Sequence, residues 1–377
     1  MANVIIFTNE YFPFKGGIGR YCEEVINEIK LQHKVTLVGP AYDSSLTRDK
    51  RSEGIRLELF PGGQFKYWHL PKLIKKVSSI DFEQYDYVLV ADWPFWVAIE
   101  FLNRFSFKRK IRFNLMLHGS EVLNLKFGRA SIFSKILNMF DGVKKIFTNS
   151  NYTKKILLEY HQVPKDISII TTYLGVNESE FARNNVFLKN VNNETFNILS
   201  VGRLDERKGF DNVIKALGML DNDVKQHIKF TIVGNGSLEF KGYLKTLAKE
   251  NSVDVEIKSG VSDAKLNELY GEANLFVLAA KSSNKKIEGF GLVFLEAAKH
   301  GVPSLATDVG AISEVVKNEN TGLVVKEDIS ELSQAIYRCY THRDLLVKFS
   351  NNCVNDVANY SWAKLADITF SVMTPTY

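Results

Sequence analysis

Short apolar runs alternate along the chain with longer segments of mixed polarity that have the length of a helix. In the first half these runs are apolar enough to be buried on both faces of a sheet. The predicted strands lie at 3–9, 34–40, 87–92, 112–119 and 145–150. Parallel strands need crossover connections, usually helices, and the spacers are long enough, as in the helical pattern at 20–31. We therefore predict a parallel sheet with helices on both faces.

A polar, asparagine-rich stretch at 178–195 interrupts the alternation, and a second series follows it. Its predicted strands lie at 196–204, 229–236, 255–261, 274–280, 303–310 and 321–325. Its predicted helices lie near 209–220, 237–250, 263–272, 292–300 and 330–349. The pattern predicts an α/β protein of two Rossmann-like, doubly wound domains, 1–178 and 195–358, that face an interdomain cleft. Ligands bind such sheets at the carboxyl ends of strands, so we expect the site at that cleft.

The composition fits this picture. With 377 residues, 45% hydrophobic and 24% charged, the chain has the size of two domains and the composition of a soluble globular protein. Its apolar runs have strand length, short of the roughly 20 residues that cross a bilayer, and its N-terminus lacks the basic region of a signal peptide. Cys22, Cys339 and Cys353 are scattered, which favours neither disulfides nor a zinc site. We expect a cytoplasmic protein with reduced thiols.

The net charge of +5 is unevenly distributed, because residues 1–178 contain 25 Lys and Arg against 18 Asp and Glu. That half could face a membrane, a nucleic acid or a phosphorylated acceptor, or it could simply be solvated. The segments 62–77 and 104–113 interleave aromatic rings, Phe113 among them, with Lys and Arg. Aromatic rings beside basic side chains suit the anionic headgroup layer of a membrane. The alternative is an ordinary amphipathic helix whose basic face is solvated. We hypothesise contact with an anionic membrane, at the inner face of the cell membrane, and no nucleic-acid partner.

Glycines precede the first predicted helix, in the loop TNEYFPFKGGIGRY at 8–21. The dinucleotide fingerprint G-x-G-x-x-G is not matched, since its third glycine would fall at Cys22. What remains is the pair Gly16 and Gly17 at a helix start, where the backbone can approach a ligand and free N–H groups can bind an anion. A tight turn without a ligand is the alternative.

Polar side chains lie at the ends of two other predicted strands. Arg203 and Lys208 follow the apolar run of 196–204 and flank the next helix start. The guanidinium of an arginine offers a planar set of donors and the ammonium of a lysine a compact charge, and together they suit a diphosphate. The alternative is a surface loop whose charges are solvated. His118 lies at the carboxyl end of 112–119, where parallel sheets bind ligands. A histidine satisfied by backbone groups is the alternative there.

The segment KIEGFGLVFLEAAKHG at 286–301 places Glu288 in a glycine-flanked turn and Glu296 in the first turns of a helix. Its GFG sequence exposes backbone amides at the helix start, and these amides with the helix dipole suit a phosphate. Glu296 could then accept hydrogen bonds from ribose hydroxyls, and Glu288 from hydroxyls elsewhere on the ligand. Two acids at this spacing could also be surface charge, but the glycines favour a site.

Taken in order, these segments resemble the retaining glycosyltransferases of family 4, which have the GT-B fold. The resemblance covers nearly the whole chain, through GGIG, HGSE, VGRLDERKG, IVGNG, EGFGLVFLEAAKHGVPSLATDVGAISEVV and TGLVV. Each motif alone is modest evidence, whereas the ordered set is specific. The late YSW at 360–362 matches where the family's last helix crosses back, so we expect residues 359–377 on the first domain.

The resemblance implies roles for the residues singled out above. Arg203 and Lys208 would hold the donor's diphosphate, Glu288 would bind the donor sugar, and His118 would contact that sugar near the reacting carbon. Glu296 would bind the ribose. The backbone amides of Phe290, Gly291 and Leu292 would hold the sugar and its phosphate. Gly16 and Gly17 would close over the diphosphate.

By the same resemblance the chain would be a metal-independent hexosyltransferase that needs no cofactor and uses a UDP-sugar or GDP-mannose as substrate. The acceptor would be a hydroxyl of a glycan or lipid-linked saccharide, in bacterial surface polysaccharide, lipopolysaccharide or glycolipid synthesis. Residues 221–223 spell the D-x-D sequence of metal-dependent transferases, but we interpret them as a solvated loop.

Two rival functions fit the same architecture. Sugar-nucleotide 2-epimerases share the GT-B fold, but we would not expect them to match the HGSE and EGFG segments so closely. A degenerate relative acting as a membrane-bound partner would have lost Arg203, Lys208 or Glu296, and all three are present. We therefore favour the glycosyltransferase.

Overall fold

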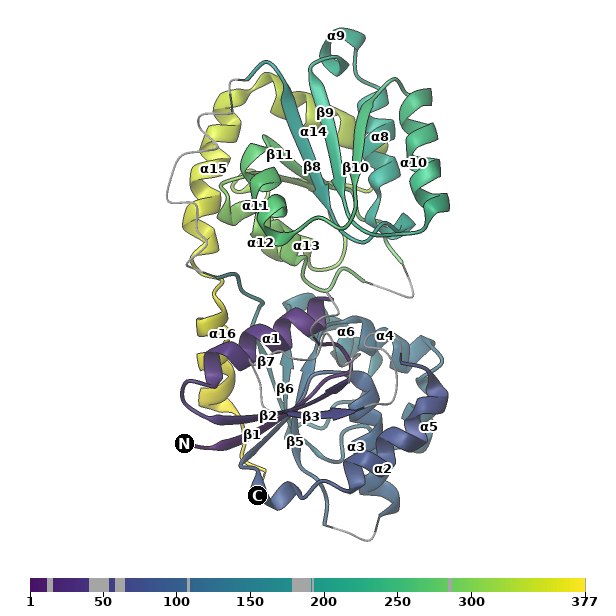
Figure 1. Cartoon of the computed structure of the whole chain (residues 1–377), viewed down its shortest axis with the longest axis vertical. Coiled ribbons are helices and arrows are strands. Elements are labelled where there is room, and N and C mark those ends of the chain that lie inside the picture. Colours follow the sequence, from purple (N-terminus) through teal and green to yellow (C-terminus); the bar gives the residue numbers. More distant parts are fainter. Residues whose placement is uncertain are drawn as a thin grey trace. The chain divides into compact units, whose positions relative to one another are not determined.

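The computed structural model describes residues 1–11, 16–40, 54–57, 65–106, 109–177, 191, 193–283 and 287–376 (Figure 1). It contains two compact units, of which unit 1 is Met1–Leu174 with Trp362–Tyr377 and unit 2 is Gly175–Ser361. The units therefore divide just before the polar stretch at which we expected the boundary. Most of that stretch, residues 178–190, lies outside the described residues.

Unit 1 is built on a parallel sheet of seven strands in the order β3-β2-β1-β4-β5-β6-β7. The strands are β1 (Asn3–Phe7), β2 (Lys34–Pro40), β3 (Gly54–Leu57), β4 (Tyr87–Val90), β5 (Phe113–Leu117), β6 (Val143–Thr148) and β7 (Ser168–Thr171). The apolar residues of the interior strand β1, Val4 to Phe7, are fully buried, as the apolar run predicts. The edge strands β3 and β7 have four residues each and were not predicted.

Helices cover the sheet of unit 1. They are α1 (Gly17–Ile29), α2 (Leu70–Ser78), α3 (Trp93–Phe105), α4 (Ser120–Phe127), α5 (Ser131–Ile136), α6 (Asn151–Tyr160) and α16 (Trp362–Val372), with the 3-10 turns η1 (Tyr67–His69) and η2 (Phe82–Gln84). The last helix, α16, lies in unit 1 and packs against α1. Figure 1 shows these two on one side of the sheet and α2 and α3 on the other.

Unit 2 repeats the plan with six parallel strands in the order β10-β9-β8-β11-β12-β13. The strands are β8 (Phe196–Val201), β9 (Ile228–Val233), β10 (Asp254–Lys258), β11 (Leu275–Leu278), β12 (Ser304–Thr307) and β13 (Gly322–Val325). The helices are α8 (Phe210–Gly218), α9 (Asn222–Lys225), α10 (Leu238–Glu250), α11 (Asp263–Glu272), α12 (Leu292–Lys299), α13 (Ile312–Val315), α14 (Ile329–Thr341) and α15 (Arg343–Val357), preceded by the 3-10 turn η4 (Glu206–Lys208).

Two doubly wound α/β units are therefore confirmed. The order in which strands are added to each sheet reverses at its first strand, because β1 lies between β2 and β4, and β8 lies between β9 and β11. Ligands of open parallel sheets bind at the carboxyl ends of the strands around such a point. The prediction of a loop at 221–223 is wrong, since α9 begins at Asn222, but these residues are exposed as expected.

Cys22, Cys339 and Cys353 are buried free thiols. In the part of the chain that the structure describes, none of the helices has both the length and the apolar character needed to cross a bilayer.

Candidate donor site

Three side chains of unit 2 form a buried ionic cluster, which we call the Glu288 cluster. Glu288 Oε2 accepts hydrogen bonds from Lys208 Nζ and from Arg207 Nη1, each at 2.8 Å. The Lys208 and Glu288 side chains are only 11% and 10% exposed. Sequence reasoning assigned Lys208 and Glu288 to different parts of a ligand, and the structure brings them into direct contact. It did not single out Arg207.

The cluster carries an excess of positive charge. Burial raises the pKa of the Glu288 carboxyl, but the charges of Lys208 and Arg207 outweigh burial, and the pKa lies below its usual value. The carboxylate is therefore ionised near neutral pH, so that two cations surround one anion. Arg207 Nε is buried and has no hydrogen-bond partner among the described residues. A buried donor of this kind calls for a further acceptor.

Backbone contacts between three loops hold the cluster in place. Gly209 follows η4 in a left-handed conformation (φ 69°), and a Cβ there would lie 1.6 Å from the carbonyl oxygen of Ala279, which follows β11. Gly310, after β12, is also left-handed (φ 66°), and its Cβ would lie 2.3 Å from the carbonyl oxygen of Glu288. That oxygen accepts a hydrogen bond of 3.0 Å from the N–H of Ala311. The carboxyl ends of β8, β11 and β12 therefore position these charges together.

Arg203 is not part of the Glu288 cluster. Its side chain is 62% exposed, and its Nε donates to Asp205 Oδ2 at 3.0 Å. Asp205 Oδ1 is buried without a hydrogen-bond partner among the described residues. Arg203 is thus an exposed cation two residues beyond β8, paired with a neighbouring acid.

The turn that leads into α12 has the form expected from its GFG sequence. Gly291 is left-handed (φ 87°) and directly precedes Leu292, the first residue of the helix. The first N–H groups of a helix have no partner within it and can bind a phosphate. The Phe290 side chain is buried and anchors the turn. Glu296, one turn further, is buried, and its Oε2 accepts a hydrogen bond of 2.9 Å from the Tyr270 hydroxyl.

Tyr270 was not predicted, because α11 carries it far from any motif in the sequence. Its hydroxyl fixes the orientation of the Glu296 carboxylate. The ring of His300 stacks on that of Tyr270, with centroids 5.5 Å apart and an interplanar angle of 7°. Glu296 is therefore held by a side chain that is itself packed.

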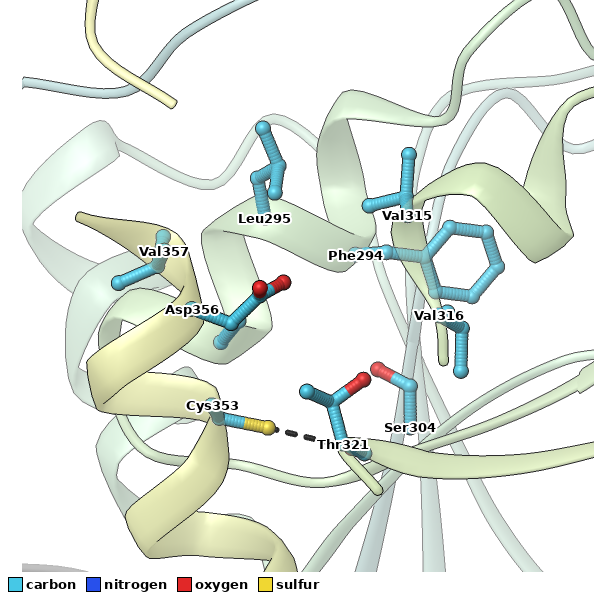
Figure 2. Close-up of a pocket in the computed structure, with 10 residues that line it drawn as sticks. Phe294, Leu295, Ser304, Val315, Val316, Thr321, Cys353, Asp356 and Val357 are labelled. Carbon is cyan, nitrogen blue, oxygen red and sulfur yellow. Dashed lines mark hydrogen bonds between the residues drawn. The ribbon is translucent and has the colours of Figure 1, made fainter. Parts of the chain in front are cut away.

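A separate pocket lies on another side of α12 and does not belong to the site (Figure 2). Phe294 and Leu295 line it from α12, and Cys353 lines it from α15. The Cys353 thiol donates to the carbonyl oxygen of Thr321 at 3.1 Å. This pocket contains none of the residues that we assigned to the donor, so it is a packing feature between α12 and α15.

In unit 1, Gly16 and Gly17 begin α1. Gly16 is its N-cap residue in an extended conformation (φ −121°). Gly17 is exposed, and a Cβ built on it would meet nothing within 4 Å. Packing within the described residues therefore gives no reason for a glycine at this position. Space beside the helix start is what a closely approaching ligand requires.

His118 follows β5, and its backbone groups are satisfied. Its N–H donates to Glu121 Oε1 at 3.2 Å, and its carbonyl oxygen accepts from Asn149 Nδ2 at 3.1 Å. The imidazole packs edge-on against the Tyr21 ring, with centroids 5.0 Å apart. Its Nε2 is buried without a hydrogen-bond partner among the described residues. Burial lowers the pKa of His118 to about 3, so the ring is neutral at physiological pH.

Other buried polar groups surround the carboxyl ends of β1, β4 and β5. Asn9 Oδ1, the Tyr21 hydroxyl and Glu121 Oε2 are buried without partners among the described residues. Burial raises the pKa of Glu121 to about 7, and burial with the charges of Glu10 and Glu121 raises that of Asp92 well above its usual value. Asn9, Asp92 and Glu121 were not predicted as site residues, although Asn9 and Asp92 end apolar runs in the sequence and Glu121 lies three positions beyond His118.

The two segments expected to meet a membrane differ in the structure. Residues 62–64 and 107–108 lie outside the described residues. Phe113 is fully buried in β5, so its predicted insertion into a headgroup layer is wrong. In the same segment, Lys110 pairs with Asp141 at 2.7 Å.

Two protein-family models match this chain, one in each half. The model of the family "Glycosyl transferases group 1" matches residues 183–355, and that of "Glycosyltransferase Family 4" matches residues 15–178. Together the two models account for most of both units.

Similar proteins span the whole length of the chain. An uncharacterized glycosyltransferase of Methanocaldococcus jannaschii is 24% identical over 98% of this chain and 97% of its own. A GDP-mannose-dependent alpha-(1-6)-phosphatidylinositol monomannoside mannosyltransferase of Mycobacterium tuberculosis is 25% identical over 97% of this chain and 98% of its own. The crystal structure of Anabaena HepE in complex with UDP and glucose superposes with a TM-score of 0.77, at 14% identity, over 98% of this chain and 99% of its own.

Proposed function

The chain belongs to glycosyltransferase family 4 and is a glycosyltransferase of the GT-B type, and from this premise we propose that it is a retaining hexosyltransferase. The donor that we propose is a UDP-sugar or GDP-mannose. The acceptor is a hydroxyl of a glycan or lipid-linked saccharide, in surface polysaccharide, lipopolysaccharide or glycolipid synthesis. The UDP bound to HepE and the GDP-mannose dependence of the mycobacterial relative support this choice of donors.

The Glu288 cluster is the observation that carries the proposal. Arg207 and Lys208 share one buried carboxylate, so one positive charge is left over where solvent has little access. The amides at the start of α12, four residues beyond Glu288, have no partner within the helix and add partial positive charge. Fixed positive charge in a poorly solvated place stabilises an anion strongly. A nucleotide-sugar brings such an anion in its diphosphate.

In the proposed reaction, the bond between the anomeric carbon and the phosphate oxygen breaks while the acceptor oxygen bonds to the same face of the sugar. The acceptor's proton passes to the departing phosphate oxygen. Lys208, Arg203 and the α12 amides stabilise the charge that grows on the leaving diphosphate. Glu288 binds a hydroxyl of the donor sugar, and Glu296, oriented by Tyr270, binds the ribose.

Unit 1 contributes His118 and the glycine pair to the same proposal. Because His118 is neutral, it acts on the donor sugar as a hydrogen-bonding group and does not supply a positive charge. Gly16 and Gly17 let the backbone approach the diphosphate. Lys208, Arg203 and the α12 amides neutralise the leaving group, so we propose that transfer needs neither a metal nor another cofactor.

The stereochemistry of donor hydrolysis tests the proposal. The full chain is incubated with UDP-glucose or GDP-mannose in the presence of EDTA, and NMR follows the anomer of the sugar first released to water. Retention predicts release of the α-anomer from these α-linked donors. Initial release of the β-anomer would contradict retention, and an epimerised nucleotide-sugar would establish the isomerase instead.

A further inference from the structure

Large apolar side chains are exposed on one part of unit 1. Trp68 in η1 is 70% exposed, and Phe127 at the end of α4 is 60% exposed. Ile132 and Ile136, one turn apart on α5, are 55% and 57% exposed. Large apolar side chains that are exposed on one surface mark an interaction site rather than ordinary surface variation.

These residues come from two distant segments of the chain that the fold brings into contact. The ring of Tyr67 in η1 stacks on that of Phe133 in α5, with centroids 6.4 Å apart and an interplanar angle of 19°. Helix α4 packs against α5. The exposed side chains of Trp68, Ile132 and Ile136 therefore flank a packed contact and belong to one surface.

The same two segments carry positive charge only. Residues 65–80 and 122–140 contain no Asp or Glu. Their lysines and arginines are Lys66, Lys72, Lys75, Lys76, Lys126, Arg129 and Lys135, and all are exposed. The Lys66 ammonium lies 5.1 Å from the centre of the Trp68 ring. We call the exposed apolar and basic residues at 66–76 and 126–136 the basic apolar surface.

We propose that the basic apolar surface docks on an anionic lipid bilayer. Trp68 and the two isoleucines of α5 enter the headgroup region, while the surrounding ammonium and guanidinium groups meet lipid phosphates. This bilayer contact rests on the proposed function, because it brings the enzyme to a lipid-linked acceptor. The membrane contact predicted from the sequence included the segment 104–113, but Phe113 of that segment is buried. The surface proposed here uses α4 and α5 instead, which were not predicted to meet a membrane.

Charge decides between a bilayer and a second copy of the chain. A symmetric dimer through this surface would place its seven cations against seven more, with no acid in either segment to offset them. An anionic bilayer offers the complementary charge and also accepts side chains that have no matching pocket. The attraction to such a bilayer falls with rising salt.

Vesicle flotation of the full chain tests this proposal. Vesicles contain either phosphatidylcholine alone or equal parts of phosphatidylcholine and phosphatidylglycerol. We expect the chain to float with the anionic vesicles only, and less at high salt. Each lysine at an anionic leaflet contributes about fivefold to partitioning, so Lys72→Gln/Lys75→Gln should weaken it by about 25-fold. Ile132→Ser/Ile136→Ser should weaken it by about tenfold.

Matched variants in unit 2 are the controls. Lys245→Gln/Lys249→Gln removes two exposed lysines of α10, and Leu238→Ser removes an exposed apolar residue of the same helix. Both should float like the parent. Equal losses in the controls and the surface variants, or no flotation of the parent at low salt, would overturn the proposal. So would dimerisation that Ile132→Ser/Ile136→Ser abolishes, since it would assign the surface to a protein contact.

Hydrolysis of the nucleotide-sugar, measured on the same preparations, separates this inference from the proposed function. Unchanged hydrolysis with no flotation would leave the glycosyltransferase standing and remove the membrane contact. Flotation without any hydrolysis would support the membrane contact and contradict the proposed transferase.

Discussion

At the level of single residues, the balance of charge in the Glu288 cluster has a direct consequence for stability. Glu288→Gln leaves Arg207 and Lys208 without their shared counter-charge. We expect it to lower the free energy of unfolding by about 3–5 kcal/mol, as for other broken buried pairs. Arg207→Ala leaves the pair of Glu288 and Lys208 intact and should cost less, about 1–3 kcal/mol. Urea unfolding measures both, and a Glu288→Gln variant as stable as the parent would contradict the buried cluster.

The proposed roles divide binding from turnover. Lys208→Ala and Glu296→Ala should weaken the binding of the nucleoside diphosphate by about 10-fold to 100-fold, because each loses a charged hydrogen bond. His118→Ala should instead lower kcat by about 100-fold with nucleotide affinity retained. Titration calorimetry and initial rates distinguish the two. Equal losses of nucleotide affinity in all three variants would refute this division.

Glu121 makes the stability of unit 1 depend on pH. Burial raises the pKa of its carboxyl in the folded chain from 4.5 to about 7. Between these values the folded state holds a proton that the unfolded state has lost, so this group lowers the stability as pH rises through that window. Glu121→Gln keeps an oxygen for the His118 N–H and removes the titration. We expect it to stabilise the chain at pH 8 by a larger margin than at pH 5, as measured by urea unfolding, and a margin independent of pH would contradict the assignment.

Arg207 shows how far single residues can be predicted from the sequence. Lys208 and Glu288 stand in recognisable glycine-rich motifs, whereas Arg207 looks like any solvated loop charge. Its partner Glu288 is 81 positions further along the chain. Only the meeting of the loops after β8, β11 and β12 shows that these charges share a carboxylate. Tyr270 was missed for the same reason, since its bond to Glu296 depends on how α11 packs.

At the level of elements, two glycines at helix starts should respond in opposite ways to alanine. Gly209→Ala puts a Cβ 1.6 Å from a carbonyl oxygen at a positive φ, and we expect it to destabilise the chain by more than about 2 kcal/mol. Gly17→Ala meets nothing within 4 Å and should leave the stability unchanged or slightly raised.

The Gly17→Ala substitution should also affect transferase activity. We expect Gly17→Ala to lose at least about tenfold in activity, because the added methyl group enters the space proposed for the donor. Thermal unfolding and donor hydrolysis measure both effects. A fully active Gly17→Ala variant would remove that glycine from the donor site.

The elements themselves could largely be predicted, because buried parallel strands are continuous apolar runs. The strands β3 and β7 were missed, since each is a short edge strand without a sustained apolar run. The short helix α9 was taken for a loop because its exposed polar residues show no helical periodicity. Likewise, the exposed apolar residues of α5 form no pattern that distinguishes them from a buried face until the packing is known.

At the scale of the whole molecule, two units whose first six strands follow the same order carry different chemistry. Unit 2 contains the Glu288 cluster and the start of α12, whereas unit 1 contains the buried polar groups around His118 and the basic apolar surface. The fold alone does not distinguish a transferase from an epimerase. The proposed transferase function therefore depends on whether the excess positive charge in unit 2 binds a nucleoside diphosphate.

A thermal-shift screen of the full chain against UDP, GDP, ADP, TDP and CMP, with and without EDTA, tests that claim most directly. A ligand at about 100 times its Kd adds about 2.7 kcal/mol to the free energy of unfolding. We predict that at least one diphosphate raises the melting temperature of the parent, that EDTA has no effect, and that Lys208→Ala loses most of the shift. No shift with any nucleotide, or a shift that EDTA abolishes, would contradict a metal-independent donor site at the Glu288 cluster.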